Sequence, residues 1–311
     1  MPRAYGASAS RLMRRVRAMD SRVVFGAVVL SLMVVLAVVV PWFAPATTTD
    51  IGDVLATRLV SPFGRDSLGH WHVLGTDAFG RDLFVRLWVG ARISLAVAVA
   101  GSALSGAIGI ALGAVAGWSG GWIDRIIASA GDALLAIPRL VLLLVIAALW
   151  GPGLWVVIVV LGLTGWMAVM RLVRAEVQVV RGLSYVEGAD ALGVPSPRVL
   201  ARHVLPNAVG SATVAITLGI GNAIVLESGL SFLGLGVQPP TASWGNMIAG
   251  GREWLLTAPW IALAPGVLLI ATVVACTMLG EGLSEQRASR ARSTEPQPDD
   301  VSADRQVHAG A

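Results

Sequence analysis

The sequence predicts an all-α membrane protein with six transmembrane helices, and three observations support this fold class. Hydrophobic residues make up 55% of the chain and charged residues only 14%, whereas a soluble domain usually carries about 25% charged residues. Several apolar segments reach the length of roughly 20 residues that is needed to cross a bilayer. Most arginines lie at the ends of these segments, as the positive-inside rule requires.

The chain opens with a basic segment and a first apolar helix. Residues 1–22 carry six arginines against one acidic residue, and we expect them to lie in the cytosol. Residues 23–43 are predicted to form the first transmembrane helix, because the apolar core is too long for a signal peptide and no small-residue cleavage site follows it. Residues 44–92 are polar, and we expect them to form an extracytoplasmic segment with an interfacial helix.

Five further apolar stretches form a predicted helical core at 93–280. They lie at residues 93–117, 126–150, 154–170, 208–230 and 260–279. A polar loop at 171–206 joins the fourth and fifth spans. In the second span, Gly109, Gly113 and Gly117 have the spacing that lets two membrane helices approach closely.

The distribution of arginines between the two sides of the membrane predicts how the helices are oriented. With the N-terminus inside, the inner segments hold 16 arginines, the outer segments hold 6, and Arg139 lies within a span. This asymmetry places both termini and the loop at 171–206 in the cytosol. The tail at 281–311 has low hydrophobicity and is predicted to be disordered. We expect the outer loop at 231–258, which is rich in Gly and Pro, to turn back into the membrane.

Composition and motifs exclude several functional classes. The single Cys276 excludes a disulfide framework and a multi-cysteine metal site. The absence of lysine and of a Gly-rich nucleotide loop excludes a P-loop ATPase. The arginines lie at helix ends, so they do not indicate a nucleic-acid surface. No nucleophile–base pair, HExxH motif or paired-acid cluster is present, so we expect no enzyme activity and no cofactor on this chain.

The loop between the fourth and fifth spans contains a distinctive pattern. Residues 187–193 read EGADALG, and after nine further residues 203–206 read HVLP. Small residues would let a short helix seat closely against a partner, and Gly193 would end that helix by adopting left-handed backbone. The pattern resembles the EAA loop of permease subunits in ATP-binding-cassette importers. The departures are Gly188 for the middle alanine, Asp190 where a basic residue is frequent, and His203 for an isoleucine.

The resemblance implies that this loop docks onto a separate ATPase. It assigns the coupling contact to Glu187, Gly188, Ala189, Ala191, Leu192, Gly193, Leu205 and Pro206. ATP and Mg²⁺ would then bind to the partner chains. The implied partners are the lipid bilayer, a homologous second permease subunit that completes a heterodimer, two ATP-binding-cassette ATPase domains and an extracytoplasmic substrate-binding protein; no nucleic acid is implied.

A second resemblance covers nearly the whole chain. Residues 72–82 read HVLGTDAFGRD, 90–95 read GARISL, and 231–240 read SFLGLGVQPP. These stretches are similar to the signatures of the dipeptide, oligopeptide and nickel permease family of ATP-binding-cassette importers. The resemblance implies a type I importer permease architecture in the bacterial inner membrane. It also implies that the chain forms half of a translocation pathway for di- or oligopeptides.

The signature at the outer surface also has a structural interpretation. It comprises Gly75, Thr76, Asp77, Gly80, Arg81 and Asp82. We expect Thr76 or Asp77 to cap a helix, and Asp82 and Arg86, four residues apart, to pair on it. This helix would lie on the outer membrane surface and lead into the second span. A metal site at His70 and His72 is disfavoured, because no further ligand is obvious.

Three ionisable residues fall inside predicted spans, where such residues are candidates for function. Asp132 and Arg139 are seven residues apart on one face of the third span, and Pro138 can kink the helix between them. We favour a pair between the two, or with a partner subunit, near the cytosolic interface. Glu227 lies near the outer end of the fifth span, and its role in lining the pathway and attracting a peptide's amino group stays open.

Other functions are compatible with parts of this sequence. The same architecture could carry nickel or another small solute. A stand-alone proton-coupled transporter is disfavoured because no clear internal repeat is present, and a channel is disfavoured because no repeated selectivity filter is present. In the family that the chain resembles, the external binding protein does most of the selecting, so the cargo lies beyond the sequence.

Overall fold

The computed structural model describes residues 21–43 and 54–294, and most of these residues are helical. The long helices are α2 (Ser21–Phe43), α4 (Leu83–Ser119), α7 (Leu154–Arg181), α10 (Leu205–Phe232) and α12 (Trp260–Thr294). The short helices are α3 (Val54–Thr57), α5 (Gly121–Leu135), α6 (Arg139–Trp150), α8 (Ser184–Ala191), α9 (Ser196–Val199), the π-helix η2 (Leu200–Val204), α11 (Trp244–Gly251) and the 3-10 helix η3 (Arg252–Trp254). Within these residues, the strands β1 (Gly64–Arg65) and β2 (Trp71–His72) form one antiparallel pair.

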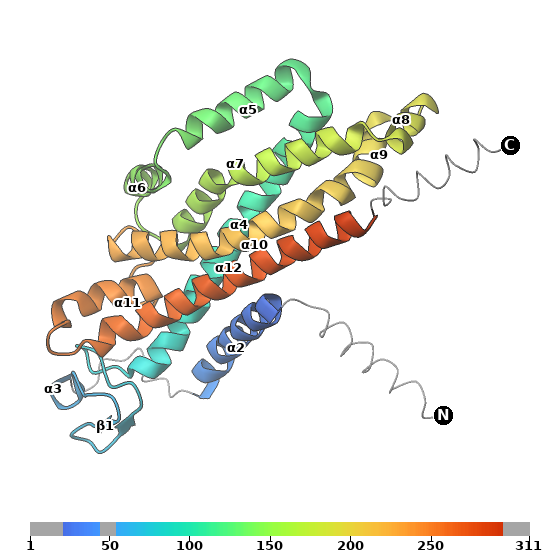
Figure 1. Cartoon of the computed structure of the whole chain (residues 1–311). Coiled ribbons are helices and arrows are strands. Elements are labelled where there is room, and N and C mark those ends of the chain that lie inside the picture. The colour runs from blue at the N-terminus through green and yellow to red at the C-terminus, as the bar shows by residue number, and fades with distance from the viewer. Residues whose placement is uncertain (1–20, 44–53, 295–311) are drawn as a thin grey trace, which may run out of the picture.

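The helices form the predicted membrane fold. Five of them are long and apolar enough to cross a membrane, and α5 with α6 forms a further candidate span that is bent by 88°. Figure 1 shows α4, α7, α10 and α12 running lengthwise through the molecule, with α5 and α6 on one side. The all-α membrane fold class is therefore confirmed.

The third span is not the single helix that the sequence predicts at 126–150. Helix α5 ends at Leu135 and α6 begins at Arg139, with the 88° bend between them. Pro138 explains the break, because proline has no N–H to donate and disfavours helical backbone at the residue before it. Asp132 and Arg139 therefore lie on different helices and do not share a face.

The second span begins earlier than predicted. The sequence predicts a surface helix that leads into a separate span at 93–117. Instead, α4 is one continuous helix of 37 residues from Leu83 to Ser119. The predicted surface helix forms the first turns of α4. No glycine or proline interrupts the chain between Leu83 and Gly90, and Gly90 itself packs closely against Met247.

The last helix also extends beyond its predicted limit. The sequence predicts disorder from residue 281, but α12 is helical to Thr294. Contacts with α2 account for the first part of this extension: Arg22 and Glu285 form an ion pair of 3.2 Å, and Gly282 packs tightly against Val23. The remaining parts of the predicted termini, 1–20 and 295–311, lie outside the described residues.

Close packing of α4 against α7 forms the centre of the bundle. A Cβ atom added at Gly109, Gly113 or Gly117 would come within 2.7 Å of an α7 atom. The lack of side chains at these positions lets the two backbones approach, and close packing of this kind holds helices together in lipid, where the hydrophobic effect does not act between them. The predicted small-residue packing surface is confirmed.

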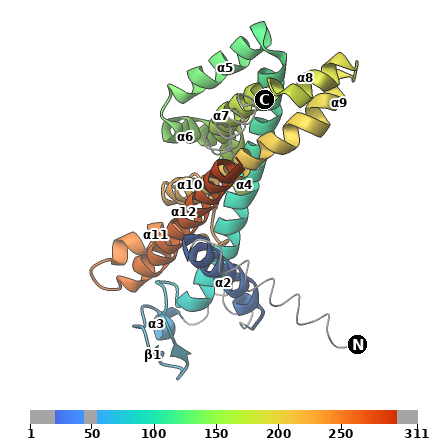
Figure 2. The ribbon, with the colours of Figure 1, turned by 45° about the vertical axis from the view of Figure 1, so that its right-hand side comes forward.

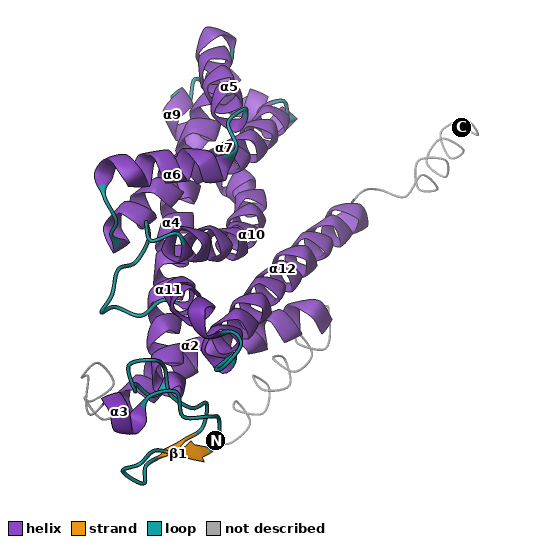
Figure 3. Ribbon diagram, turned by 90° about the vertical axis from the view of Figure 1, so that its left-hand side faces the viewer, coloured by secondary structure: helices purple, strands orange, loops and turns teal. Residues whose placement is uncertain are grey.

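The two polar regions singled out in the sequence lie at opposite ends of the long helices. Helices α8 and α9 lie at one end, and α3 and β1 lie at the other end (Figures 1 and 2). Figure 3 shows the same separation, with α9 and α5 far from β1. This arrangement is the one expected of a cytosolic docking loop and an extracytoplasmic segment.

Candidate functional site

The predicted docking loop contains a short helix with one buried and one exposed side. Val186 of α8 is 1% exposed and packs in a cluster with valines of α7, and Ala189 packs against the same cluster. Leu192 is 86% exposed. No atom lies within 4 Å of a Cβ atom built at Gly188. The exposed members of the predicted coupling contact are Glu187, Gly188, Ala191, Leu192, Gly193 and Pro206.

Gly193 ends this part of the loop as predicted. Its φ angle is +74°, in the left-handed region that glycine favours. The N–H of Val194 donates to the carbonyl of Ala189 at 3.2 Å, which is the bond of a Schellman cap. Pro195 then precedes α9, so the chain turns sharply between two short helices.

The chain then passes through the π-helix η2 into α10. Val199, Val204 and Ala208 are buried in the same cluster as the valines of α7. Leu205 is the first residue of α10 and is half-buried. Pro206 is exposed in the first turn, where proline is tolerated because the N–H groups of a first turn have no partner within the helix. The unit formed by α8, α9 and η2 is therefore fixed to both α7 and α10.

The outer signature forms a hydrogen-bonded loop that precedes α4. The buried hydroxyl of Thr76 donates to the carbonyl of Thr57 at 2.6 Å and accepts from the N–H of Val60 at 2.9 Å. Gly75 and Gly80 have φ angles of +77° and +76°, and a side chain at either would collide with Val60 or Thr57. The signature thus fastens this loop to residues 57–60, at the end of α3 and just after it.

The acidic residues of the signature act differently from the prediction. Asp77 accepts from the backbone N–H of Arg81 at 3.0 Å and from its Nε at 2.8 Å. Asp82 caps α4 by accepting a backbone N–H in its first turn, so the prediction that Thr76 or Asp77 caps the helix is wrong. The predicted Asp82–Arg86 pair does not form, because Asp82 is taken up by the cap and Arg86 Nε lies 3.4 Å from Asp77.

The two histidines of this region contact carboxylates. His72 Nδ1 lies 2.7 Å from Asp82 Oδ2, and His72 Nε2 lies 3.4 Å from Asp66 Oδ2. Burial raises the pKa of Asp66, but hydrogen bonds from the His70 backbone and from both histidine side chains outweigh it and hold the pKa below its ordinary value. The described residues contain no group of three or more His, Cys, Asp or Glu side chains that could hold a metal ion.

Asp132 does not pair with Arg139. Its carboxylate pairs with Arg171 of α7, and both side chains are exposed. The next acid along α5, Asp124, is bonded by Arg174 of α7, with Nη2 2.7 Å from Oδ2. These ion pairs hold α5 against α7, and they leave Arg139 free to point elsewhere.

Glu227 is enclosed by hydroxyl groups near the junction of α10, α4 and α11. Its carboxylate is 0% exposed and accepts hydrogen bonds from Ser231 at 2.8 Å and from Ser94 at 3.0 Å. Ser94 Oγ in turn accepts from the backbone N–H of Trp244 at 3.1 Å. In this structure the carboxylate faces serines, and a role for Glu227 in lining the pathway stays a prediction.

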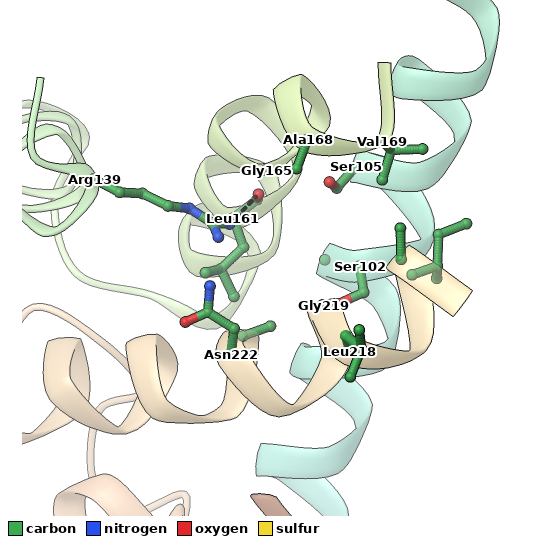
Figure 4. Close-up of a pocket in the computed structure, with 14 residues that line it drawn as sticks. Ser102, Ser105, Arg139, Leu161, Gly165, Ala168, Val169, Leu218, Gly219 and Asn222 are labelled. Atoms are coloured by element: carbon green, nitrogen blue, oxygen red, sulfur yellow. Dashed lines mark hydrogen bonds between the residues drawn. The ribbon is translucent and has the colours of Figure 1, made fainter. Parts of the chain in front are cut away.

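Arg139 points into a pocket between α4, α6, α7 and α10 (Figure 4). The pocket has a volume of about 410 Å³. Its other polar side chains are Ser102 and Ser105 of α4 and Asn222 of α10. Sequence patterns did not identify these three as site residues. Polar side chains within apolar spans were the available signal, but only helix packing shows that they share a pocket with Arg139.

Comparisons with known proteins agree on one family. The model of the family described as "binding-protein-dependent transport system inner membrane component" matches residues 109–290. A putative peptide permease protein of Brucella suis biovar 1 is 38% identical over 270 residues, which cover 86% of this chain and 87% of that protein. An oligopeptide transport system permease protein of Bacillus subtilis is 36% identical over 260 residues, covering 84% and 83%. A glutathione transport system permease protein of Escherichia coli is 38% identical over 254 residues, covering 82% of each chain.

Proposed function

The chain belongs to the family of binding-protein-dependent transport system inner membrane components, the permease subunits of ATP-binding-cassette importers, and from this premise we propose that it forms half of a translocation pathway for di- or oligopeptides. The names of its relatives support this cargo, because they refer to peptides, oligopeptides and glutathione, which is a tripeptide. These names do not favour nickel or a stand-alone proton-coupled carrier.

The proposed assembly lies in a bacterial inner membrane. A homologous second permease completes the pathway, two ATP-binding-cassette ATPase domains lie on the cytosolic side, and a substrate-binding protein delivers peptides from outside. The arginine distribution supports an orientation with both termini in the cytosol. ATP and Mg²⁺ bind to the partner chains, so this subunit acts by changing shape rather than by catalysis.

The observation that carries the proposal is the construction of α8. Its buried side is fixed to α7 and α10 through Val186, so a force on α8 reaches two long helices. Its other side exposes Glu187, and Leu192 in the following turn is also exposed. The open space at Gly188 lets a partner surface approach the backbone. We assign α8 and the following turn to the contact with the ATPase.

Charge reversal at Glu187 tests the docking role. Glu187→Arg changes only an exposed side chain, so we expect the subunit to insert in the membrane and assemble as the wild type does. We expect peptide uptake to fall at least tenfold, because the altered charge opposes the seating of α8 in its partner. Uptake of a radiolabelled dipeptide and ATP hydrolysis are measured together in proteoliposomes that contain the whole importer.

Glu281→Arg is the matched control, since it reverses an exposed acidic residue on a different helix, α12. This control should keep wild-type uptake. Wild-type uptake by the Glu187→Arg importer would show that α8 does not transmit the motion of the ATPase. Absence of peptide uptake by the wild-type importer itself would instead count against the proposed cargo.

A further inference from the structure

Arg139 is a cation whose charge has no acidic partner in the described part of the chain. Its Nε donates to Thr164 Oγ1 at 3.4 Å and its Nη2 donates to the Leu161 carbonyl at 3.3 Å. Both acceptors are uncharged, and both bonds are longer than the usual ~2.9 Å. Arginine has five N–H donors, so most of its hydrogen-bonding capacity remains unused. A charge inside a membrane protein is costly unless a partner compensates it.

The fold makes room for this cation. A Cβ atom added at Gly165 of α7 would lie 2.8 Å from Arg139 Nη2 and 2.6 Å from Ser105 Oγ. The absence of a side chain at Gly165 therefore leaves a notch that both the guanidinium and the hydroxyl border. Figure 4 shows Arg139 entering from α6, and the Asn222 side chain extending toward it from α10. Four helices thus contribute to one recess, in which Arg139 and a few polar side chains lie among apolar residues.

The lining of the recess is richer in hydrogen-bond donors than in acceptors. Arg139, Ser105 and Asn222 all carry donors, and no carboxylate lines the recess. A ligand that matches it must supply negative oxygen atoms, and a planar carboxylate fits the forked guanidinium best. The volume of about 410 Å³ falls at the small end of ligand pockets, which span about 300–1,000 Å³.

We propose that this recess is a subsite that binds the C-terminal carboxylate of the peptide during its passage, with Arg139 as the charged partner and Ser105 and Asn222 as neutral donors. The proposal rests on the proposed function, because it presumes a cargo with a free carboxylate. The long hydrogen bonds from Arg139 to Thr164 and Leu161 are weak, so the guanidinium can exchange them for bonds to the cargo with little loss of binding free energy. An acidic side chain from the second permease is the competing occupant.

Competition binding tests the subsite directly. The importer is purified in lipid nanodiscs without the binding protein or nucleotide, so that only the membrane subunits can bind the probe. The probe is radiolabelled alanyl-alanine, and the competitors are unlabelled alanyl-alanine and its C-terminal amide. We expect the free acid to compete at least tenfold more strongly than the amide, because only the acid offers a carboxylate to Arg139.

Variants separate a carboxylate subsite from a merely structural arginine. In Arg139→Gln we expect at least a tenfold loss of affinity for the acid and a loss of the acid preference, with partial recovery of both in Arg139→Lys. Gly165→Ala keeps the charge but fills the notch, and it should also reduce the preference. Arg171→Gln removes a cation outside the recess and should leave the preference unchanged.

Three outcomes would overturn the subsite. They are equal competition by acid and amide in the wild type, an unchanged preference in Arg139→Gln, and no saturable binding to the wild-type importer. A different pair of results would identify an acidic side chain of the second permease as the occupant. Acid and amide would compete equally in the wild type, and the second permease would be lost when the Arg139→Gln importer is purified. Peptide uptake by the wild-type importer, measured with its binding protein, tests the proposed function separately, because uptake can persist when this subsite is absent.

Discussion

At the scale of single residues, Glu227 is a buried carboxyl group that hydroxyl groups hold in place, and it forms no ion pair within the described part of the chain. Hydroxyl groups from α4 and α10 donate hydrogen bonds to it. Ser94 also accepts a hydrogen bond from the backbone N–H of Trp244, which extends the network to α11. Each hydroxyl of this network has a partner. The carboxylate therefore joins three elements at the end of the bundle opposite α8.

Removal of this carboxylate should destabilise this end of the bundle. Glu227→Ala leaves buried hydroxyls without their acceptor, and an unsatisfied buried polar group costs about 1–3 kcal/mol. We expect a lower melting temperature for the purified importer, followed by fluorescence-detected size-exclusion chromatography. Glu253→Ala, at an exposed position on η3, should melt as the wild type does. An unchanged melting temperature for Glu227→Ala would mean that the network does not hold the three elements together.

At the scale of elements, the contact between α4 and α7 depends on the absence of side chains. In Gly113→Ala the new Cβ atom would lie 2.7 Å from the carbonyl oxygen of Met170 and 2.9 Å from Val173 Cβ. The helices must then separate, and overpacking of this kind costs about 1–3 kcal/mol. We expect a lower melting temperature of the importer in the same chromatographic assay.

Gly266→Ala on α12 is the matched control for this contact, because nothing lies within 4 Å of its new Cβ atom. Alanine is favoured over glycine inside a helix by about 0.5–1 kcal/mol, so this variant should be unchanged or slightly more stable. Equal melting temperatures for the two variants would show that the contact between α4 and α7 tolerates an added methyl group.

The same elements show what the sequence could predict. The glycine spacing on α4 and the left-handed Gly193 follow from local rules, and both are confirmed. The break at Pro138 is different, because proline permits either a kink or a full bend and only packing against α7 decides between them. Asp82 could cap a helix or pair with Arg86, and the sequence does not show that Asp77 takes Arg86 while His72 contacts Asp82. The recess at Arg139 combines residues from four helices, so no local pattern reveals it.

At the scale of the whole molecule, α7 and α10 connect α8, the proposed docking helix, to the recess. Val173 and Val177 of α7, with Ala208 and Ala212 of α10, form the cluster that buries Val186. Val169 belongs to this cluster and also lines the recess. The two regions are therefore parts of one packed unit, and we expect a movement of α8 to alter the recess.

A substitution beneath α8 tests this connection without touching the exposed docking surface. Val186→Ala removes two buried carbon atoms, which weakens the anchor by roughly 2 kcal/mol. We expect ATP hydrolysis to continue while the number of peptides imported per ATP falls several-fold, because α8 can then move without moving α7 and α10. Val179→Ala makes the same chemical change at an exposed position on α7 and should keep wild-type coupling. Wild-type coupling in Val186→Ala would mean that force reaches the long helices by a route other than the valine cluster.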